Sequence, residues 1–208
     1  MRVAPEGWPF IAGFWALEAI LILFGWSTAA MLWLPVAIWV VAFFRDPVRN
    51  GPRGEGLVIA PADGLVVSVR AIDEPDFHGA EVQRVSIFMN VFNVHVNRYP
   101  VDGSIAYRKY TPGAFVNAAA EKASLENEQS SVGITTPRGK VLVRQIAGLI
   151  ARRIITDHGE GTTVRQGERM GLIRFGSRVD VFLPAGATVK VAEGERTKAG
   201  ISVIAEWA

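Results

Sequence analysis

The chain of 208 residues contains no cysteine. This absence excludes disulfide bonds, thiolate metal ligands and cysteine nucleophiles. Histidine is scarce, with only His78, His95 and His158 in the whole chain. The formal net charge is small, at +2, and does not favour general attraction to a nucleic-acid polyanion. We therefore expect neither cysteine chemistry nor a nucleic-acid partner.

Charge is also nearly absent from the N-terminal part, where Glu18 is the only ionisable side chain between Trp8 and Phe44. Residues 8–26 form an apolar run of 19 residues, close to the roughly 20 helical residues that cross a bilayer core. A second apolar run, 29–44, contains 16 residues and is interrupted by a proline. Residues 1–50 are therefore predicted to form a membrane-anchoring α-helical hairpin.

Arginine flanks the apolar region on both sides, with Arg2 before it and Arg45, Arg49 and Arg53 after it. Two spans would return the chain to its starting side, and the positive-inside tendency places that side in the cytoplasm. A hairpin that dips into one leaflet is the alternative, and both stay open. Glu18 is interpreted as a protonated or hairpin-paired side chain, with a functional intramembrane acid as the other possibility.

Residues 51–208 have a different pattern, in which glycine and proline separate short runs rich in valine and isoleucine. Such runs are typical of β-strands. The clearest are 64–70, 85–89, 140–144 and 178–183, and the only segment with a helical pattern is 114–127. We therefore predict a mostly β domain, a compact barrel or sandwich.

A weak internal repeat supports this fold class. Residues 161–173 and 186–201 share the order Gly-x-Thr-Val-basic, then Gly-Glu-Arg, then Gly-aliphatic. Such strand, tight turn and strand phrases resemble the barrel-sandwich hybrid of lipoyl and biotinyl domains, with glycines that supply positive φ at the turns. The repeat informs the fold and not the chemistry.

His95 lies in an unusual mixture of apolar and polar residues, 87–100. Its polar neighbours Asn90, Asn93 and Asn97 alternate with large apolar side chains. Burying these polar groups is costly unless they are paired. A satisfied core network and an active-site wall explain the pattern equally well.

Asp63 and Ser177 are each weak signals by themselves. Asp63 lies in an Asp-Gly turn that leads into a strand, and such turns are usually structural. Ser177 follows Gly176 between two apolar strands, where a β-bulge would also explain the pair. The Gly-x-Ser-x-Gly elbow of α/β-hydrolases is absent around Ser177.

Taken together, these segments resemble the short bacterial form of the phosphatidylserine decarboxylase family. The resemblance covers nearly the whole chain, and the matching pieces occur in the family's order. They are residues 43–47, 61–64, 88–100, 126–128 and 171–179.

The resemblance implies that the chain cuts itself between Gly176 and Ser177. Ser177 matches the serine that attacks the preceding carbonyl and becomes a pyruvoyl group, His95 the histidine that acts as its base, and Asp63 the aspartate that completes a protease-like triad. The products would be a β chain of residues 1–176 and an α chain of residues 177–208.

The chain departs from the family pattern near two of these positions. Phe175 and Arg178 flank the Gly-Ser pair, where the motif is usually Leu-Gly-Ser-Thr. Arg98 stands where longer members carry a second histidine. Any role of that second histidine is therefore in doubt for this chain.

The implied activity is conversion of phosphatidylserine to phosphatidylethanolamine, with an archaetidylserine-type substrate left open. The pyruvoyl group would form a Schiff base with the substrate amine and act as the electron sink, with no metal. His95 is the candidate proton donor. Asn90, Asn93 and Arg98 are candidate contacts for the substrate phosphate or carboxylate.

The implied location is the bacterial inner membrane, with the catalytic domain on the cytoplasmic side. The two chains would form a heterodimer, and these heterodimers could pair. The main alternative is a membrane-anchored adaptor with a lipoyl-like domain and no catalysis. A serine hydrolase with the same triad is another, whereas a biotin or lipoyl carrier would need a hairpin lysine in a motif that the sequence lacks.

Overall fold

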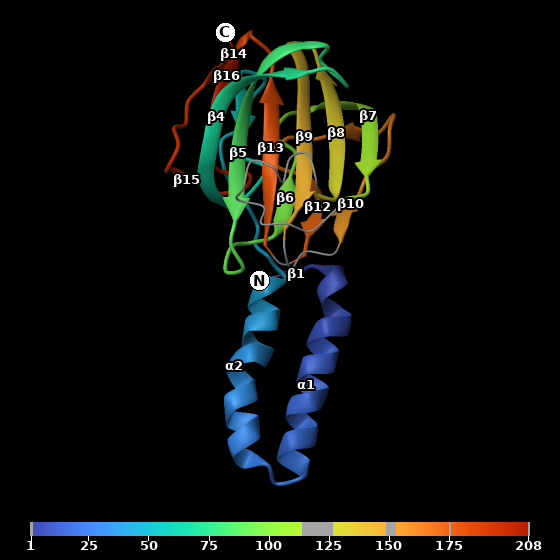
Figure 1. Ribbon diagram of the computed structural model, residues 1–208, viewed down its shortest axis with the longest axis vertical. Helices are drawn as coiled ribbons and strands as arrows, with labels where there is room; N and C mark the ends of the chain where they lie inside the picture. The colour runs from blue at the N-terminus through green and yellow to red at the C-terminus, as the bar shows by residue number, and fades with distance from the viewer. Residues whose placement is uncertain (1, 114–126, 149–152, 175, 208) are drawn as a thin grey trace. The chain divides into compact units, whose positions relative to one another are not determined.

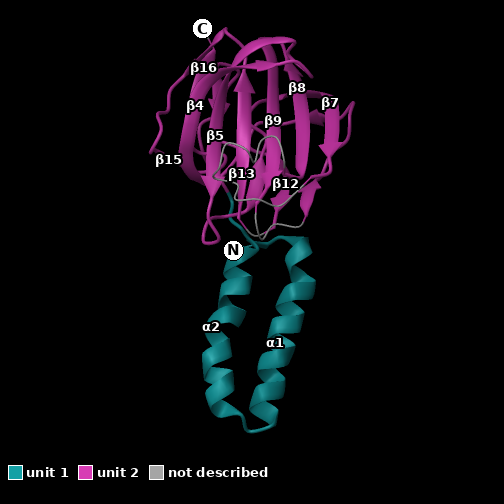
Figure 2. Cartoon of the chain, in the orientation of Figure 1, with its two compact units in different colours: residues 1–48 teal, residues 49–208 magenta. Residues whose placement is uncertain are grey.

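The computed structural model describes residues 2–113, 127–148, 153–174 and 176–207. The chain divides into two compact units, residues 1–48 and residues 49–208 (Figure 2). This boundary lies two residues from the one expected from the sequence. The roles given to the two parts, membrane anchor and self-cleaved decarboxylase domain, stay predictions.

The N-terminal unit is a pair of helices, as the sequence predicts. The turn between the helices contains Gly25, whose φ of 74° lies in the left-handed region that favours glycine. The side chain of Trp33 donates a hydrogen bond to the carbonyl of Phe14, 3.1 Å away, and stacks on its ring. The elements in chain order are β1 (Arg2–Val3), η1 (Pro5–Gly7), α1 (Trp8–Leu23), α2 (Ser27–Phe43) and β2 (Arg45–Asp46), with β1 antiparallel to β2.

The helices differ in how well they suit a bilayer. The continuous helical stretch Pro5–Leu23, 19 residues long, has the length and composition to cross a membrane, whereas the apolar helix α2 has 17 residues. Large apolar side chains such as Leu23 and Met31 are exposed on the unit's surface. Glu18 is buried, and its Oε2 atom has no hydrogen-bond partner within the described part of the chain. The choice between two spans and a shallow hairpin stays a prediction.

The second unit is built from antiparallel sheets, and the expected mostly β fold after a helical hairpin is confirmed. Its largest sheet has eight strands and curves around the core (Figure 1). In spatial order the strands are β11 (Thr163–Val164), β7 (Gly103–Thr111), β8 (Gln129–Thr136), β9 (Gly139–Ala147), β13 (Ser177–Leu183), β5 (Ala80–Met89), β4 (Gly64–Glu74) and β15 (Arg196–Thr197).

Two three-stranded sheets complete the unit. One has the order β10 (Ile154–Thr156), β12 (Arg169–Ile173) and β6 (Val96–Arg98). The other has the order β14 (Ala187–Val189), β16 (Val203–Trp207) and β3 (Leu57–Ile59). A single apolar cluster joins all three sheets, with members such as Ile87, Val179, Met170 and Ile204.

The strands predicted from the sequence are confirmed. The runs 64–70, 85–89, 140–144 and 178–183 lie in β4, β5, β9 and β13. The predicted helix 114–127 lies outside the described residues except for its last residue. In both copies of the repeat, a glycine with positive φ precedes the Glu-Arg step, with φ of 81° at Gly167 and 91° at Gly194. These are the tight turns that the repeat predicts.

Strand β13 is the most enclosed strand of the large sheet. It pairs with β5 along its whole length and with β9 from Ser177 to Phe182. All seven of its residues are buried, so both of its faces are covered. Val179 belongs to the apolar core, whereas Arg178 and Asp180 on the other face form an ion pair of 2.8 Å. Ser177 is therefore the first residue of a strand that is fixed on every side.

A buried carboxylate, Glu74, ends strand β4. Burial alone would raise the pKa of Glu74. The backbone N–H groups of His78 and Phe77, the imidazole of His78 and the charge of Arg144 outweigh burial and hold that pKa below its usual value of 4.5. The ionised form of Glu74 therefore stabilises the fold above pH 4.5, and this contribution is lost as the pH falls through the lowered pKa.

We predict that Glu74→Gln lowers the melting temperature at neutral pH, because the amide cannot replace a carboxylate bound by two backbone N–H groups. The difference from the parent chain should shrink as the pH falls below 4.5. Thermal unfolding in detergent over a pH series measures it. Asp76→Asn, which removes a half-exposed ion pair with Lys109, is the control and should show little effect. A difference at Glu74 that does not change with pH would contradict the prediction.

Candidate active site

The candidate site forms where two sheets meet. In the smaller sheet β6 pairs with β12, and the amide of Ile173 bonds the carbonyl of His95, 3.4 Å away. The chain then leaves β12 and enters β13 of the large sheet at Ser177. Because this connection has only three residues, it places Gly176 beside His95.

His95 faces the Gly176-Ser177 step with one ring nitrogen. The side chain is fully buried, its Nδ1 lies 3.0 Å from the carbonyl oxygen of Asn93, and its Nε2 lies 3.4 Å from the backbone nitrogen of Gly176. A carbonyl only accepts a hydrogen bond and an amide N–H only donates one. These contacts therefore assign the proton to Nδ1 and make Nε2 the acceptor of the Gly176 N–H group, so Nε2 carries no proton, as a general base requires.

Ser177 is buried, and its hydroxyl has a weak partner. The Oγ atom donates to the thioether sulfur of Met89, 3.5 Å away, which is a poor acceptor. Gly176 before it has φ of 71°, a conformation that glycine adopts at little cost. A Cβ at Gly176 would meet nothing within 4 Å, so backbone conformation and not space favours glycine there.

Asp63 is held elsewhere in the structure. Its Oδ2 accepts a hydrogen bond from Arg49 at 2.7 Å, and its Oδ1 accepts one from the backbone amide of Ala199 at 2.7 Å. Neither partner is His95, so the structure does not bring the expected triad together. Asp63 instead fastens the turn before β4 to the C-terminal segment. The participation of Asp63 in a triad stays a proposal.

Gly64, which follows Asp63, has a packing reason to be glycine. A Cβ at Gly64 would lie 2.2 Å from the carbonyl oxygen of Phe88 on the neighbouring strand β5. This close approach of the two strands is a structural reason for glycine after Asp63. It accounts for Gly64 without any catalytic role.

The three candidate substrate contacts have partners within the protein. The Oδ1 atoms of Asn90 and Asn93 accept hydrogen bonds from backbone amides of their own loop, at 2.9 Å each. Arg98 donates to the carbonyl of Gly167, 3.1 Å away. These bonds shape the loop that carries His95, and substrate contact by these residues stays a prediction.

The other two histidines lie away from Ser177. The imidazole of His78 contacts Glu74 and the carbonyl of Lys140, and its side chain is 3% exposed. The polar residues around His78 in the sequence suggest an exposed loop position, and the structure shows that this interpretation is wrong. His158 accepts or donates a hydrogen bond with the hydroxyl of Tyr99, 3.1 Å away. Burial raises the pKa of Tyr99 well above its usual value, so Tyr99 stays neutral in this pair.

Three side chains near the site were not expected to function from the sequence. Met89 contacts Ser177, and the buried side chains of Asn97 and Gln145 continue from Met89 into the interior. Asn97 lies two residues after His95 on the same side of β6, a spacing that the sequence displays. The residues around Gln145 do not mark it as part of a site, because its partner Asn97 lies 48 residues away in the sequence.

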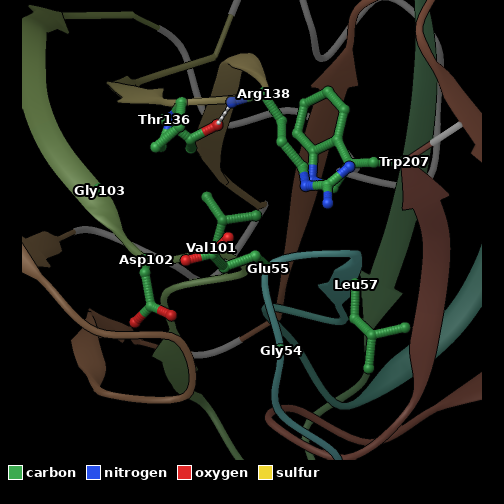
Figure 3. A pocket seen from close by; sticks show the side chains of 10 residues that line it. Gly54, Glu55, Leu57, Val101, Asp102, Gly103, Thr136, Arg138 and Trp207 are labelled. Carbon is green, nitrogen blue, oxygen red and sulfur yellow. Dashed lines mark hydrogen bonds between the residues drawn. The ribbon is translucent and has the colours of Figure 1, made fainter.

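A separate cavity of about 190 Å³ lies beside the turn that joins β8 and β9 (Figure 3). That turn is at the end of β9 opposite to Ala147, the residue paired with Ser177. The cavity is therefore remote from the candidate site. Its lining residues are Gly54, Glu55, Leu57, Val101, Asp102, Gly103, Thr136, Pro137, Arg138 and Trp207. No cluster of three or more potential metal ligands occurs among the residues with described positions.

Comparison with known proteins gives the class of this chain. The family model for phosphatidylserine decarboxylase matches residues 36–205. A phosphatidylserine decarboxylase proenzyme from Nitrosomonas europaea is 51% identical over 208 residues, which cover 99% of this chain and 95% of the relative. Proteins of the same name from Nitrosomonas eutropha and Nitrobacter winogradskyi are each 49% identical, with 99% of this chain covered and 95% and 84% of the relatives. The chain belongs to the phosphatidylserine decarboxylase family.

The position of Asp63 predicts the effect of its removal. Asp63→Ala deletes two short hydrogen bonds and leaves Arg49 without its carboxylate, so we expect a loss of about 1–3 kcal/mol in the free energy of unfolding. Denaturant titration in detergent measures this loss. Asp73→Ala, at an exposed position of β4, is the matched control and should be near neutral. Equal stability of the two variants would contradict the fastening role.

Proposed function

We propose that this chain decarboxylates phosphatidylserine to phosphatidylethanolamine at the membrane, after cutting itself between Gly176 and Ser177. The observation that carries the proposal is the contact of His95 Nε2 with the amide of Gly176, directly before Ser177. In a member of this family, that contact supports a role of His95 as the base at the Gly-Ser step that the resemblance marks for cleavage.

The proposed cut begins with attack of Ser177 Oγ on the carbonyl carbon of Gly176, while His95 Nε2 takes the hydroxyl proton. The peptide C–N bond breaks, His95 returns the proton to the leaving nitrogen, and an ester joins Gly176 to the Ser177 oxygen. Removal of the α proton then breaks the Cβ–Oγ bond and leaves Gly176 as a carboxylate. Addition of one water to the remaining dehydroalanine releases one ammonia and yields a pyruvoyl group at residue 177.

Serine is the residue from which a pyruvoyl group is made. The Ser177 hydroxyl donates to a weak thioether acceptor, and Ser177, Met89 and His95 are fully buried. A pyruvoyl group supplies an electron sink for the electrons that carbon dioxide leaves behind. His95 is positioned to hold and return a proton next to residue 177. For Asp63 to join this machinery, its carboxylate would have to replace the carbonyl of Asn93 as the partner of His95 Nδ1.

The fold explains how two fragments would stay together. The segment 177–208 begins with β13, which lies between β5 and β9, and continues with strands that pair with β3 and β4. Each of those partner strands belongs to the segment 1–176. The cut would therefore yield a tightly held heterodimer of its own α and β chains, and a pair of such heterodimers is the larger assembly we propose.

The apolar helical unit supports action at a membrane. The stretch Pro5–Leu23 has the length and composition of a span, and a diacyl substrate stays in the bilayer. We place the enzyme at the bacterial inner membrane with the β-rich unit on the cytoplasmic side, because Arg2 and Arg45 flank the helices.

The activity assay uses the purified chain in mixed micelles of detergent and phosphatidylserine, with release of carbon dioxide and formation of phosphatidylethanolamine as readouts. Ser177→Ala should be inactive, and His95→Ala should lose at least about 100-fold, the usual share of a general acid or base. An archaetidylserine-type lipid in a parallel assay tests the head-group class.

Ser104→Ala, an exposed serine on β7, is the control and should keep the parent rate. An inactive parent chain, or an active Ser177→Ala variant, would contradict the proposal. The first result would favour a membrane-anchored adaptor without catalysis.

A further inference from the structure

We infer that Asn97 is a positioning residue for Ser177, and that three other polar side chains fix which way its amide points. The inference rests on the proposed self-cleavage at Ser177. The four side chains, here called the amide relay, are Ser130, Thr156, Gln145 and Asn97. They come from β8, β10, β9 and β6, so two sheets contribute to one chain of hydrogen bonds.

The relay is continuous from β8 to the site. The hydroxyls of Ser130 and Thr156 lie 2.9 Å apart, and the Thr156 hydroxyl donates to Gln145 Oε1 at 2.9 Å. Gln145 Nε2 donates to Asn97 Oδ1 at 2.8 Å. Asn97 Nδ2 then points to the sulfur of Met89 at 3.6 Å. Gln145 and Asn97 are fully buried and Ser130 nearly so.

The hydrogen bonds of the relay run in one direction. Thr156 gives its only hydroxyl proton to Gln145, so Ser130 must donate to Thr156. Gln145 then uses its oxygen as acceptor and its nitrogen as donor, which engages the oxygen of Asn97. Because unpaired polar groups in the interior are costly, this order leaves the N–H side of Asn97 facing Met89.

Met89 connects the relay to the nucleophile. Its sulfur receives both the Asn97 amide and the Ser177 hydroxyl, and Met89 is the strand partner of Ser177 in the sheet. The amide of Asn97 therefore ends on the atom that holds the Ser177 proton. His95, directly before β6, contacts the amide of Gly176, whereas Asn97 within β6 contacts Met89, the strand partner of Ser177.

The orientation of the Asn97 amide matters because its N–H group faces the sulfur that receives the Ser177 hydroxyl. A reversed amide would turn its carbonyl oxygen toward that sulfur, and two acceptors would face each other with no proton between them. The repulsion would displace the Met89 side chain, and with it the acceptor of the Ser177 hydroxyl. The relay keeps a donor on the Met89 side, so the sulfur stays where it holds the hydroxyl loosely.

Two nearly isosteric substitutions test this role. Gln145→Glu replaces the donor with a second acceptor, so Asn97 turns its N–H group to residue 145 and its oxygen to the Met89 sulfur. Asn97→Asp puts a carboxylate oxygen against that sulfur directly. Both should slow self-cleavage by at least about tenfold, on the scale of losing a positioned donor in an active site. The readout is the fraction of cut chain against time after cell-free synthesis into lipid nanodiscs.

The control variants distinguish a change in the orientation of the Asn97 amide from a loss of fold stability. Gln166→Glu changes another buried glutamine, whose nitrogen donates to the carbonyls of Leu57 and Pro100, and it should cleave at the parent rate. Thr156→Ser keeps the hydroxyl and should retain cleavage, whereas Thr156→Val should slow it. Melting temperatures measured in a Ser177→Ala background compare all variants as uncut chains.

The outcomes are distinct. Slow cleavage in Gln145→Glu and Asn97→Asp, with Gln166→Glu and Thr156→Ser at the parent rate and comparable melting temperatures, supports the relay. Parent-rate cleavage in Gln145→Glu overturns it and leaves the proposed function standing. Equal slowing in Gln166→Glu also overturns it, because general destabilisation would then be the cause. A parent chain that never cuts itself contradicts the proposed function and the relay together.

Discussion

The burial of β13 between β5 and β9 is the constraint on which the candidate site depends. A strand paired on both sides and covered on both faces cannot shift its register without displacing the sheet. Ser177, its first residue, is therefore held in one place. The same pairing would keep the segment 177–208 in the fold after the proposed cut, so one structural feature would both position the proposed nucleophile and retain the product.

The second requirement is that His95 reach the residue before that strand. Pairing of β6 with β12 carries His95 to the end of β12, and the short connection to β13 brings the amide of Gly176 to His95 Nε2. The carbonyl of Asn93 accepts a hydrogen bond from Nδ1 on the other side of the ring. The position of His95 beside a Gly-Ser step is thus a consequence of sheet topology. The loop asparagines Asn90 and Asn93 serve this arrangement by shaping the turn before His95.

Much of this could be predicted from the sequence, since the information is local. Apolar runs without charge predict the helices, and valine-rich segments bounded by glycine predict the strands. The resemblance of their segments to the family predicts that His95 lies close to the Gly176-Ser177 step, and the structure places it there. The partner of Asp63 could not be predicted in this way, because Ala199 lies 136 residues further along the chain. An aspartate in a turn is satisfied by whichever donors the fold brings to it.

The amide relay shows the same limit. Asn97 alternates with His95 on one strand, so its side of the strand follows from periodicity. Its partner Gln145 is 48 residues away and its neighbours are apolar or basic, so nothing local distinguishes it from an ordinary strand residue. The direction of each hydrogen bond in the relay depends on all four side chains together, and these side chains meet only when the two sheets have assembled.

Self-cleavage at Gly176-Ser177 would divide the chain into two pieces, which the mass of the purified chain under denaturing conditions reveals. We expect two polypeptides, residues 1–176 ending in a free carboxylate and residues 177–208 with a pyruvoyl group in place of an N-terminal amine. A single intact chain in a preparation that decarboxylates phosphatidylserine would contradict it.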